Sequence, residues 1–383
     1  MKIAFSFIGG VHQFLHGAPV AAALSRRPGV EVHAYVATQP DAVALAGMLR
    51  ALGGEKVRVV EMRLPLLPAS VGASLKVARL AWWACRMRSA DAIVALERTS
   101  ALLRRLPGRC PPLIQIPHGV GGARRAGGGG VDRRFSLFQL ALVAGSADRR
   151  STLEQGLLRE EQVVAVGQVK LAGLRRMGKL ERSRLFANEK PTIIYNPHFH
   201  PRRGTWENFG QPLIEAVRSD GSFNLVVAPH VRLFQDVPDD VRRSLEALSD
   251  PDWLIVDTGS QRSIDMTYTL GGDIYLGDFS SQLYEWLIYP RPCVFIDQIA
   301  DGGMDDTKLP TMWSLGETVT DFAQVLPALH RAAGRHATFR EAQDDAVRDA
   351  MGDPAIPADE AAAGAICDFV SRQSRVRRRP SDR

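Results

Sequence analysis

The chain has 383 residues, of which 45% are hydrophobic and 23% charged. This length suits two or three domains, and this composition is that of a globular protein, so a disordered, collagen-like or coiled-coil architecture is excluded. The 48 Lys and Arg residues outnumber the 42 Asp and Glu residues, for a formal charge of +6. This excess favours anionic partners such as nucleotide phosphates or an acidic lipid surface. Much of it lies in the tail 371–383, so we expect no nucleic-acid groove along the body.

In the first half, apolar runs of strand length alternate with helical patterns, as in a doubly wound α/β sheet. The N-terminal run breaks at Gly9-Gly10 and is typical of a buried strand, not a signal peptide. The expected strands are 2–8, 30–36, 56–62, 92–96, 112–116, 140–144 and 163–166. The expected helices are 19–26, 41–52, 70–88, 99–106 and 174–187.

A second alternating series follows the linker 188–191. Its expected strands are 192–195, 224–228, 253–256, 273–276 and 293–296. Its expected helices are 209–218, 239–248, 263–270 and 281–288, and residues from 317 onward are expected to be helical up to an unstructured basic tail. We therefore predict an acceptor-side domain at 1–187, a nucleotide-binding domain at 188–345, and a C-terminal helix with a tail at 346–383.

The four cysteines stand far apart without a Cys-x-x-Cys pair. This spacing indicates neither a disulfide framework nor a zinc site, and it fits a reducing cytoplasm. No apolar stretch approaches the roughly 18 residues of a membrane-spanning helix, so any membrane contact is expected to be peripheral. The segment 70–88 has an apolar face with Trp82-Trp83 and four basic residues, which suits either a membrane interface or a core helix.

Polar residues directly after strands are the candidates for chemistry, because ligands of such folds bind at the carboxyl ends of the strands. In 271–297, a buried strand is followed by Asp278 and then by Ser280 and Ser281 at a helix start. Unpaired N–H groups and two hydroxyls there would hold a phosphate. The alternative is that Ser280 only caps the helix.

Histidines follow three other expected strands. His230 and His118 each stand at a strand end, where an imidazole can donate to a phosphate or act as a base. The stretch 195–206 holds a further cluster, namely His198, His200, Arg202 and Arg203. It indicates either a phosphate-facing group or a solvated loop, and the two histidines lack a third metal ligand, so we expect no metal.

Glycines in the first strand–helix turn, 9–20, permit close approach of a ligand, and His16 lies in this segment. The turn has no Gly-x-Gly-x-x-Gly, and the chain has no phosphate-binding loop of the NTPase type and no Gly-x-Ser-x-Gly. These absences weigh against a dinucleotide enzyme, a P-loop NTPase and an α/β-hydrolase.

Together the segments 117–119, 167–170, 195–200, 277–281 and 290–297, with His230, resemble the CDP-glycerol:poly(glycerophosphate) glycerophosphotransferase family. In these segments the family has Trp-His-Gly, Gly-Tyr-Pro-Arg, Tyr-Ala-Pro-Thr-Trp-Arg, Thr-Asp-Tyr-Ser-Ser and Arg-Pro followed by Asp. The resemblance implies a GT-B fold, with two Rossmann-like parallel-sheet domains facing across a cleft. It adds Lys170 to the substrate-binding candidates.

The resemblance also implies a reaction in which an acceptor hydroxyl attacks the β-phosphate of a CDP-alditol and CMP leaves. The acceptor would be linked to lipid or glycan, and no cofactor is expected. His118 would be the base, with His230 and Asp278 as further catalytic residues. The other candidates would bind substrate and neutralise its charge.

Two other enzyme classes suit the same residues. One is a GT-B glycosyltransferase with a nucleotide-sugar donor. The other is a UDP-GlcNAc 2-epimerase-like enzyme, since the spacing of Asp278 and Glu285 is loosely similar to a helix start in that family. A non-enzymatic protein bound to a membrane surface is a further alternative.

Overall fold

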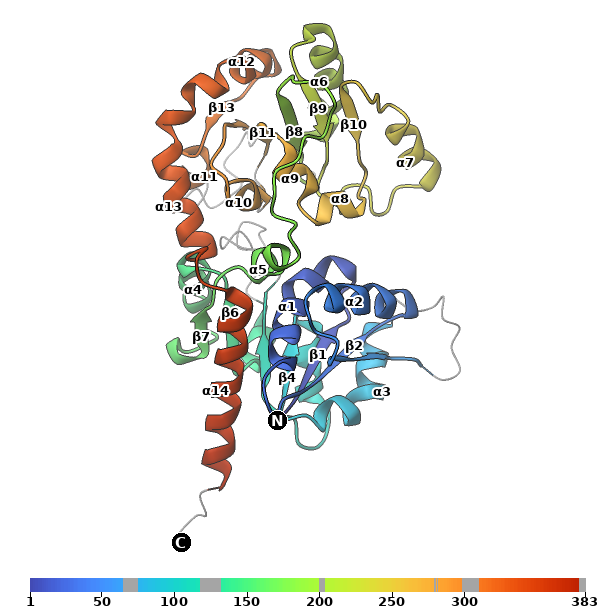
Figure 1. Ribbon diagram of the computed structural model, residues 1–383, viewed down its shortest axis with the longest axis vertical. Helices are drawn as coiled ribbons and strands as arrows, with labels where there is room; N and C mark the ends of the chain where they lie inside the picture. Colours follow the sequence, from blue (N-terminus) through green and yellow to red (C-terminus); the bar gives the residue numbers. More distant parts are fainter. Residues whose placement is uncertain are drawn as a thin grey trace. The chain divides into compact units, whose positions relative to one another are not determined.

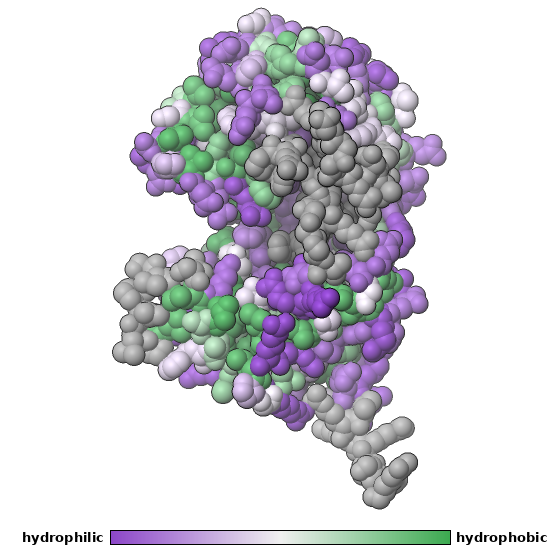
Figure 2. All heavy atoms as spheres, turned by 180° about the vertical axis from the view of Figure 1, so that it is seen from behind, coloured by the Kyte–Doolittle hydropathy of each residue, from purple (hydrophilic) through white to green (hydrophobic). Residues whose placement is uncertain are grey.

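The computed structural model describes residues 1–64, 75–117, 132–199, 204–278, 280, 282–297 and 310–378. The chain divides into two compact units (Figure 1). In the described part, the first consists of the residues up to Lys179 and of those from Arg348 onward, and the second consists of Leu180–Val347. No helix in the described part is long and apolar enough to cross a membrane. On the face drawn in Figure 2, hydrophilic and hydrophobic residues are interspersed over both units.

The described part of the first unit contains a seven-stranded parallel sheet in the order β3-β2-β1-β4-β5-β6-β7. The strands are β1 (Lys2–Phe7), β2 (Glu31–Val36), β3 (Arg58–Glu61), β4 (Ala92–Ala95), β5 (Leu113–Gln115), β6 (Leu140–Val143) and β7 (Val163–Ala165). The central strands read as continuous apolar runs because helices cover both faces of a parallel sheet. Residue Ile3 of β1 pairs with Val32 on one side and Ala92 on the other.

The helices of this unit form two layers over the sheet. They are α1 (Phe14–Ser25), α2 (Gln39–Ala51), α3 (Lys76–Arg88), α4 (Ser146–Leu153), α5 (Val169–Arg176) and α14 (Ala358–Arg378). Helices α1, α5 and α14 pack against one another, so the C-terminal helix completes the core begun by the first strand. A Cβ on Gly173 of α5 would lie 2.5 Å from Cγ of Pro19, so this contact requires glycine.

The second unit has a parallel sheet in the order β10-β9-β8-β11-β12-β13. Its strands are β8 (Thr192–Asn196), β9 (Asn224–Val227), β10 (Leu254–Val256), β11 (Ile274–Gly277), β12 (Cys293–Ile296) and β13 (Glu317–Val319). Its helices are α6 (Trp206–Asp220), α7 (Asp239–Glu246), α8 (Gln261–Ile264), α9 (Thr267–Gly271), α10 (Gln282–Trp286), α11 (Pro310–Trp313), α12 (Val325–Arg335) and α13 (Arg340–Met351), which continues past the division between the units. Both units therefore have the doubly wound α/β architecture expected from the sequence.

The helix expected at 174–187 is wrong. Helix α5 begins earlier, at Val169, and ends at Arg176. Gly178 follows with φ of +66°, and the Lys179 N–H donates to the Leu174 carbonyl. A left-handed glycine with this bond is a standard helix C-terminus, and the polar residues beyond it have no apolar face to bury.

Other expected helices differ in extent or type. Residues 99–105 form a 3-10 helix, and the helix expected at 263–270 is divided into α8 and α9 by Met266, whose φ is +69°. Helix α4 was not expected, and its sequence has few apolar positions.

The expectation that everything from residue 317 is helical is also wrong. Residues Glu317–Val319 form β13, an edge strand paired with β12. The basic tail is helical as far as Arg378, because α14 buries Ala362, Ile366 and Val370 at a helical spacing and adding turns to an existing helix costs little.

Candidate functional site

The candidate site lies at the carboxyl edge of the second sheet. Strands β8 and β11 are neighbours there, and the chain order runs outward from them in opposite directions. Such a switch point separates the loops that follow the two strands and leaves a crevice, which is where ligands of open α/β sheets bind. The loops after β8, β9 and β11 carry His198, His230 and Asp278, so three of the expected site residues meet at one edge.

Asp278 joins two of these loops. Its side chain is 2% exposed, and its carboxylate accepts the backbone N–H of His198 at 2.9 Å. It also accepts the backbone N–H of Thr205 at 3.0 Å and the Thr205 hydroxyl at 3.2 Å. The carboxylate therefore holds both ends of the segment 198–205 onto the end of β11.

Burial gives Asp278 an unusual protonation equilibrium. Removal from water raises its pKa from 3.8 to about 7, and the hydrogen bonds from His198 and Thr205 oppose this shift without cancelling it. A charged carboxylate loses hydration that fixed donors replace only in part. The group that fixes this loop thus changes charge near neutral pH.

Three further buried residues brace the same edge. The Tyr195 hydroxyl lies 2.9 Å from the Thr205 hydroxyl, and the Asn196 amide donates to the Ala228 carbonyl at 2.6 Å. The Tyr275 hydroxyl donates to the Asn196 side-chain oxygen at 3.4 Å. Burial raises the pKa of both tyrosines, so their hydroxyls stay neutral donors. These roles were not expected from the sequence, although Asn196 and Thr205 stand inside the segment singled out there.

The rings of His198 and His230 lie next to each other, in the loops that follow β8 and β9. Their ring centroids are 5.6 Å apart, and Phe199 packs 4.7 Å from His230. The Arg232 guanidinium lies 4.4 Å from the centre of the Phe199 ring. The His230 backbone N–H donates to the Pro197 carbonyl, which ties the two loops together. An imidazole pair and a guanidinium thus gather at this edge.

The tautomer of His230 follows from its neighbour. Its Nδ1 lies 3.2 Å from the backbone N–H of Arg232 and must accept that hydrogen. When the ring is neutral its proton is therefore on Nε2.

Ser280 is a helix cap. Its side chain is 2% exposed, and its Oγ accepts the backbone N–H of Gln282 at 3.3 Å. Helix α10, which follows Ser280, begins at Gln282, has five residues and carries Glu285. This hydrogen bond from Gln282 to Ser280 is the one expected if Ser280 caps the helix. Four other residues expected at this edge lie outside the described part of the chain, namely His200, Arg202, Arg203 and Ser281. His118, expected after a strand of the first unit, also lies outside it.

Two of the expected site residues that the structure describes belong to the first unit. His16 on α1 is 8% exposed and Lys170 on α5 is 5% exposed. The two helices pack against each other, and the Gln168 side chain accepts the Lys170 backbone N–H at 3.4 Å. These residues are buried polar groups within the first unit.

The Arg-Pro pair of the resemblance has a packing role. Arg291 is buried and donates to the carbonyls of Thr269 and Gly272 at 2.6 Å each and to that of Trp286 at 2.7 Å. Its guanidinium carbon lies 3.6 Å from the centre of the Trp286 ring, and burial lowers its pKa to about 9. It joins the end of α9, the start of β11 and the end of α10.

Asp257, at the end of β10, is a strand-end carboxylate that the sequence interpretation missed. It accepts the N–H groups of Gly259 and Ser260 and the hydroxyl of Tyr268 at 2.7 Å. Burial acts to raise its pKa, but these hydrogen bonds outweigh burial and lower it. Its position directly after an expected strand was the available signal. Within the described ranges, no three His, Cys, Asp or Glu side chains are arranged to hold a metal ion.

Comparison with known proteins gives no relative by sequence, since no protein-family model and no curated protein matches the chain. Solved structures do match. The UDP-GlcNAc 2-epimerase from Neisseria meningitidis, bound to UDP-GlcNAc, has a TM-score of 0.64 and 13% identity over 97% of this chain and 100% of that one. The wall teichoic acid polymerase TagF, soaked with CDPG, has a TM-score of 0.65 and 14% identity over 98% of this chain and 89% of that one.

The MnaA protein of S. aureus in complex with UDP is also similar, with a TM-score of 0.61 and 14% identity over 100% of this chain and 99% of that one. The chain has a GT-B-like fold. Identities at this level establish the fold, and function has to be argued from the site.

Proposed function

We propose that this chain transfers a glycerophosphate, or a related phospho-alditol, from a CDP-activated donor to an acceptor hydroxyl and releases CMP. An acceptor linked to lipid or glycan would place the reaction in cell-envelope biosynthesis. The observation that carries the proposal is the Asp278 carboxylate, which fixes the His198 loop beside His230 at the sheet's switch point. Support also comes from the family resemblance and from the similar fold of TagF soaked with CDPG.

The reaction makes two demands on the protein. The acceptor oxygen bonds to the β-phosphorus while the bond from that phosphorus to the oxygen of CMP breaks, and the hydroxyl proton passes to a base. Negative charge grows on the departing phosphate, so donors and cations must face it. In the proposal His118 takes the proton, and the second unit holds the phosphates.

The strand-end residues suit the second demand. The Nε2–H of neutral His230 is a donor for a phosphate oxygen, and Arg232 adds a positive charge on the same loop. Asp278 acts as a positioning residue, because it holds the backbone of the loop rather than a histidine ring. The remaining proposed contacts to substrate are Ser280, Ser281, His198, His200, Arg202, Arg203, Glu285, Lys170 and His16.

A nucleotide-sugar reaction is the second candidate. The structures of similar fold that hold UDP-GlcNAc and UDP favour it, and the same strand-end edge would serve. A glycosyltransferase would use attack at carbon, and an epimerase would need no acceptor. Asp278 and Glu285 would then be the residues to examine first.

The test is a melting-temperature panel with CMP, CDP, UDP and UDP-GlcNAc, followed by turnover assays. We expect CDP and CMP to raise the melting temperature most, since a ligand stabilises the state it binds. CMP release from CDP-glycerol should require a lipid or glycan acceptor. Interconversion of UDP-GlcNAc without acceptor would instead establish the epimerase.

A pair of histidine variants locates the nucleotide. We expect His230→Ala to weaken CDP binding about tenfold, as for loss of a charged hydrogen bond. His336→Ala is the matched control, because His336 contacts Gln343 on another part of the unit. Equal CDP affinity in the two variants would place the nucleotide away from His230.

Cytoplasmic location with peripheral attachment to the inner face of the membrane belongs to the same proposal. On α3, Trp82 is 62% and Val77 56% exposed, and Lys76–Arg88 contains no acidic residue. An exposed tryptophan among basic residues suits an anionic lipid surface.

A further inference from the structure

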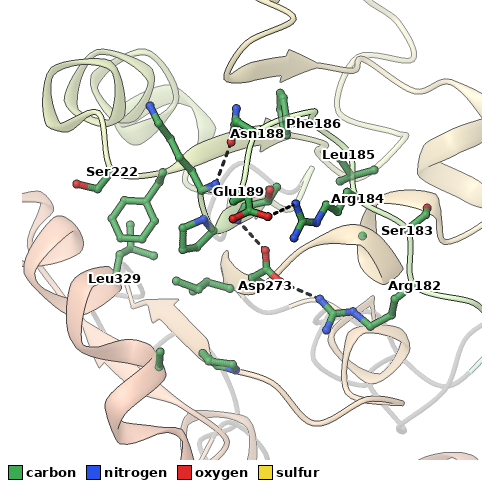
Figure 3. A pocket seen from close by; sticks show the side chains of 18 of the residues that line it. Arg182, Ser183, Arg184, Leu185, Phe186, Asn188, Glu189, Ser222, Asp273 and Leu329 are labelled. Atoms are coloured by element: carbon green, nitrogen blue, oxygen red, sulfur yellow. Dashed lines mark hydrogen bonds and ion pairs between the residues drawn. The ribbon is translucent and has the colours of Figure 1, made fainter.

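A cavity of about 760 Å³ opens at the amino-terminal edge of the second sheet (Figure 3). It lies where β8 and β11 begin, and so at the opposite ends of the strands that carry His198 and Asp278. All of its lining residues belong to the second unit. They come from the segment 182–192, the turn between α6 and β9, the start of β11, Pro292, and α12.

The inner wall of this cavity is apolar. Phe186, Phe223, Ile274 and Leu329 line it and are at most 6% exposed. His330, also in the lining, packs with its ring centroid 4.9 Å from that of Phe223. Cavities of this size with aromatic walls and a few polar groups are typical sites for small organic molecules.

The rim carries more positive than negative charge. Arg182 is paired with Asp273, whose carboxylate also accepts the Thr192 N–H. Arg184 is paired with Glu189, but their side chains are 67% and 85% exposed, so water and salt screen this pair strongly. Lys190 has no acidic partner among the described residues, which leaves one cation in excess at the mouth.

The segment that carries these cations is fixed in place. The Asn188 and Asn224 side chains hydrogen bond to each other in both directions. The Lys190 N–H donates to Asn188, and the Lys190 carbonyl accepts from Asn224 at 3.0 Å. The mouth is therefore built on an ordered backbone, and binding need not organise it first.

We propose that this cavity is a second ligand site, for a small organic anion with a flat apolar body. The apolar part would pack against Phe186 and Phe223, and the anionic group would meet Lys190 and Arg184. The five residues of β8, at about 3.3 Å each, place this site about 15 Å from the strand-end edge. Its residues are separate from those proposed to bind nucleotide, so a ligand in each can be held at once.

The probe for the test is 8-anilino-1-naphthalenesulfonate, a flat aromatic anion, titrated by fluorescence against the folded full-length protein first without CDP and then in saturating CDP. We expect saturable binding of one probe molecule. Ala333→Trp should abolish it, since Ala333 is an exposed residue of α12 in the lining and a large ring there fills the cavity. Ala323→Trp, on an exposed residue outside the lining, should leave binding unchanged.

Charge is tested separately. Lys190→Glu combined with Arg184→Glu should weaken the sulfonate about tenfold or more, whereas Lys56→Glu on the first unit should not. N-phenyl-1-naphthylamine, which lacks the sulfonate, should be insensitive to the charge reversal. Absence of saturable binding, unchanged binding in Ala333→Trp, or displacement of the probe by CDP would overturn the proposal. A nucleotide that fails to bind would refute the proposed reaction and leave this result standing.

Discussion

Replacement of Asp278 by Asn should change how the stability of the protein depends on pH. In the folded state burial raises the pKa of this carboxyl from 3.8 to about 7. The folded state therefore binds its proton more tightly than the unfolded state does. The stabilisation by the proton is complete below the unfolded pKa and is lost as the pH rises through the folded pKa.

The size of the effect follows from this shift. Between about pH 5 and pH 7 the folded protein holds roughly one more proton at this site, so the free energy of unfolding falls by about 1.4 kcal/mol per pH unit. Asn does not titrate. From about pH 5 to pH 8, the free energy of unfolding of the wild type should fall by about 3 kcal/mol relative to Asp278→Asn.

At the acidic end the variant should be the less stable protein. Its amide nitrogen would face the backbone N–H of His198, which the native carboxyl oxygen accepts at 2.9 Å. A buried donor left without an acceptor costs about 1–3 kcal/mol. The two unfolding curves should therefore converge, and they can cross, as the pH rises.

The assay is urea unfolding at a series of pH values, followed by tryptophan fluorescence, to which the second unit contributes four of the six tryptophans. Asp257→Asn is the matched control, since the pKa of Asp257 is lowered and its titration is complete below this range. A constant difference between wild type and Asp278→Asn would refute the reasoning. A rise in the stability of the wild type relative to the variant with increasing pH would also refute it. The three hydrogen bonds donated to Asp278 by His198 and Thr205 would then outweigh the effect of burial on its pKa.

Three other variants test the packing and the surface. Gly173→Ala should cost about 1–3 kcal/mol of unfolding free energy, because its Cβ would meet Pro19. At Gly47 a Cβ has open space, so the control Gly47→Ala should be neutral or stabilising by up to about 1 kcal/mol. Equal effects of the two variants in urea unfolding would contradict the α1–α5 contact. Arg291→Ala should cost about 3 kcal/mol or more, since it leaves several buried carbonyls unpaired, and a neutral result would show that water replaces the guanidinium. Trp82→Ala should weaken binding to phosphatidylserine vesicles several-fold in a flotation assay, and unchanged flotation would remove α3 from the membrane proposal.

The positions of all described strands except the edge strand β13 could be predicted, because a strand buried on both faces is a continuous apolar run with turn residues at its ends. The strand-end rule then placed His198, His230 and Asp278 at one edge, as the sheet order confirms. Strand ends are local features of the chain, and parallel strands carry them to a common edge. Asp257 was missed although the same rule applies to it.

Other properties depended on contacts between residues far apart in the chain. The raised pKa of Asp278 comes from burial, and Arg291 is a packing residue because carbonyls up to 22 positions away converge on it. The cavity at the amino-terminal edge is assembled from five separate segments, none of which has a ligand-binding pattern of its own. The sequence by itself determined the positions of twelve of the thirteen described strands and the residue types at their ends, since these follow from local periodicity. Only the tertiary structure decided which of those groups lose water and which meet, because desolvation and proximity arise when distant segments pack together.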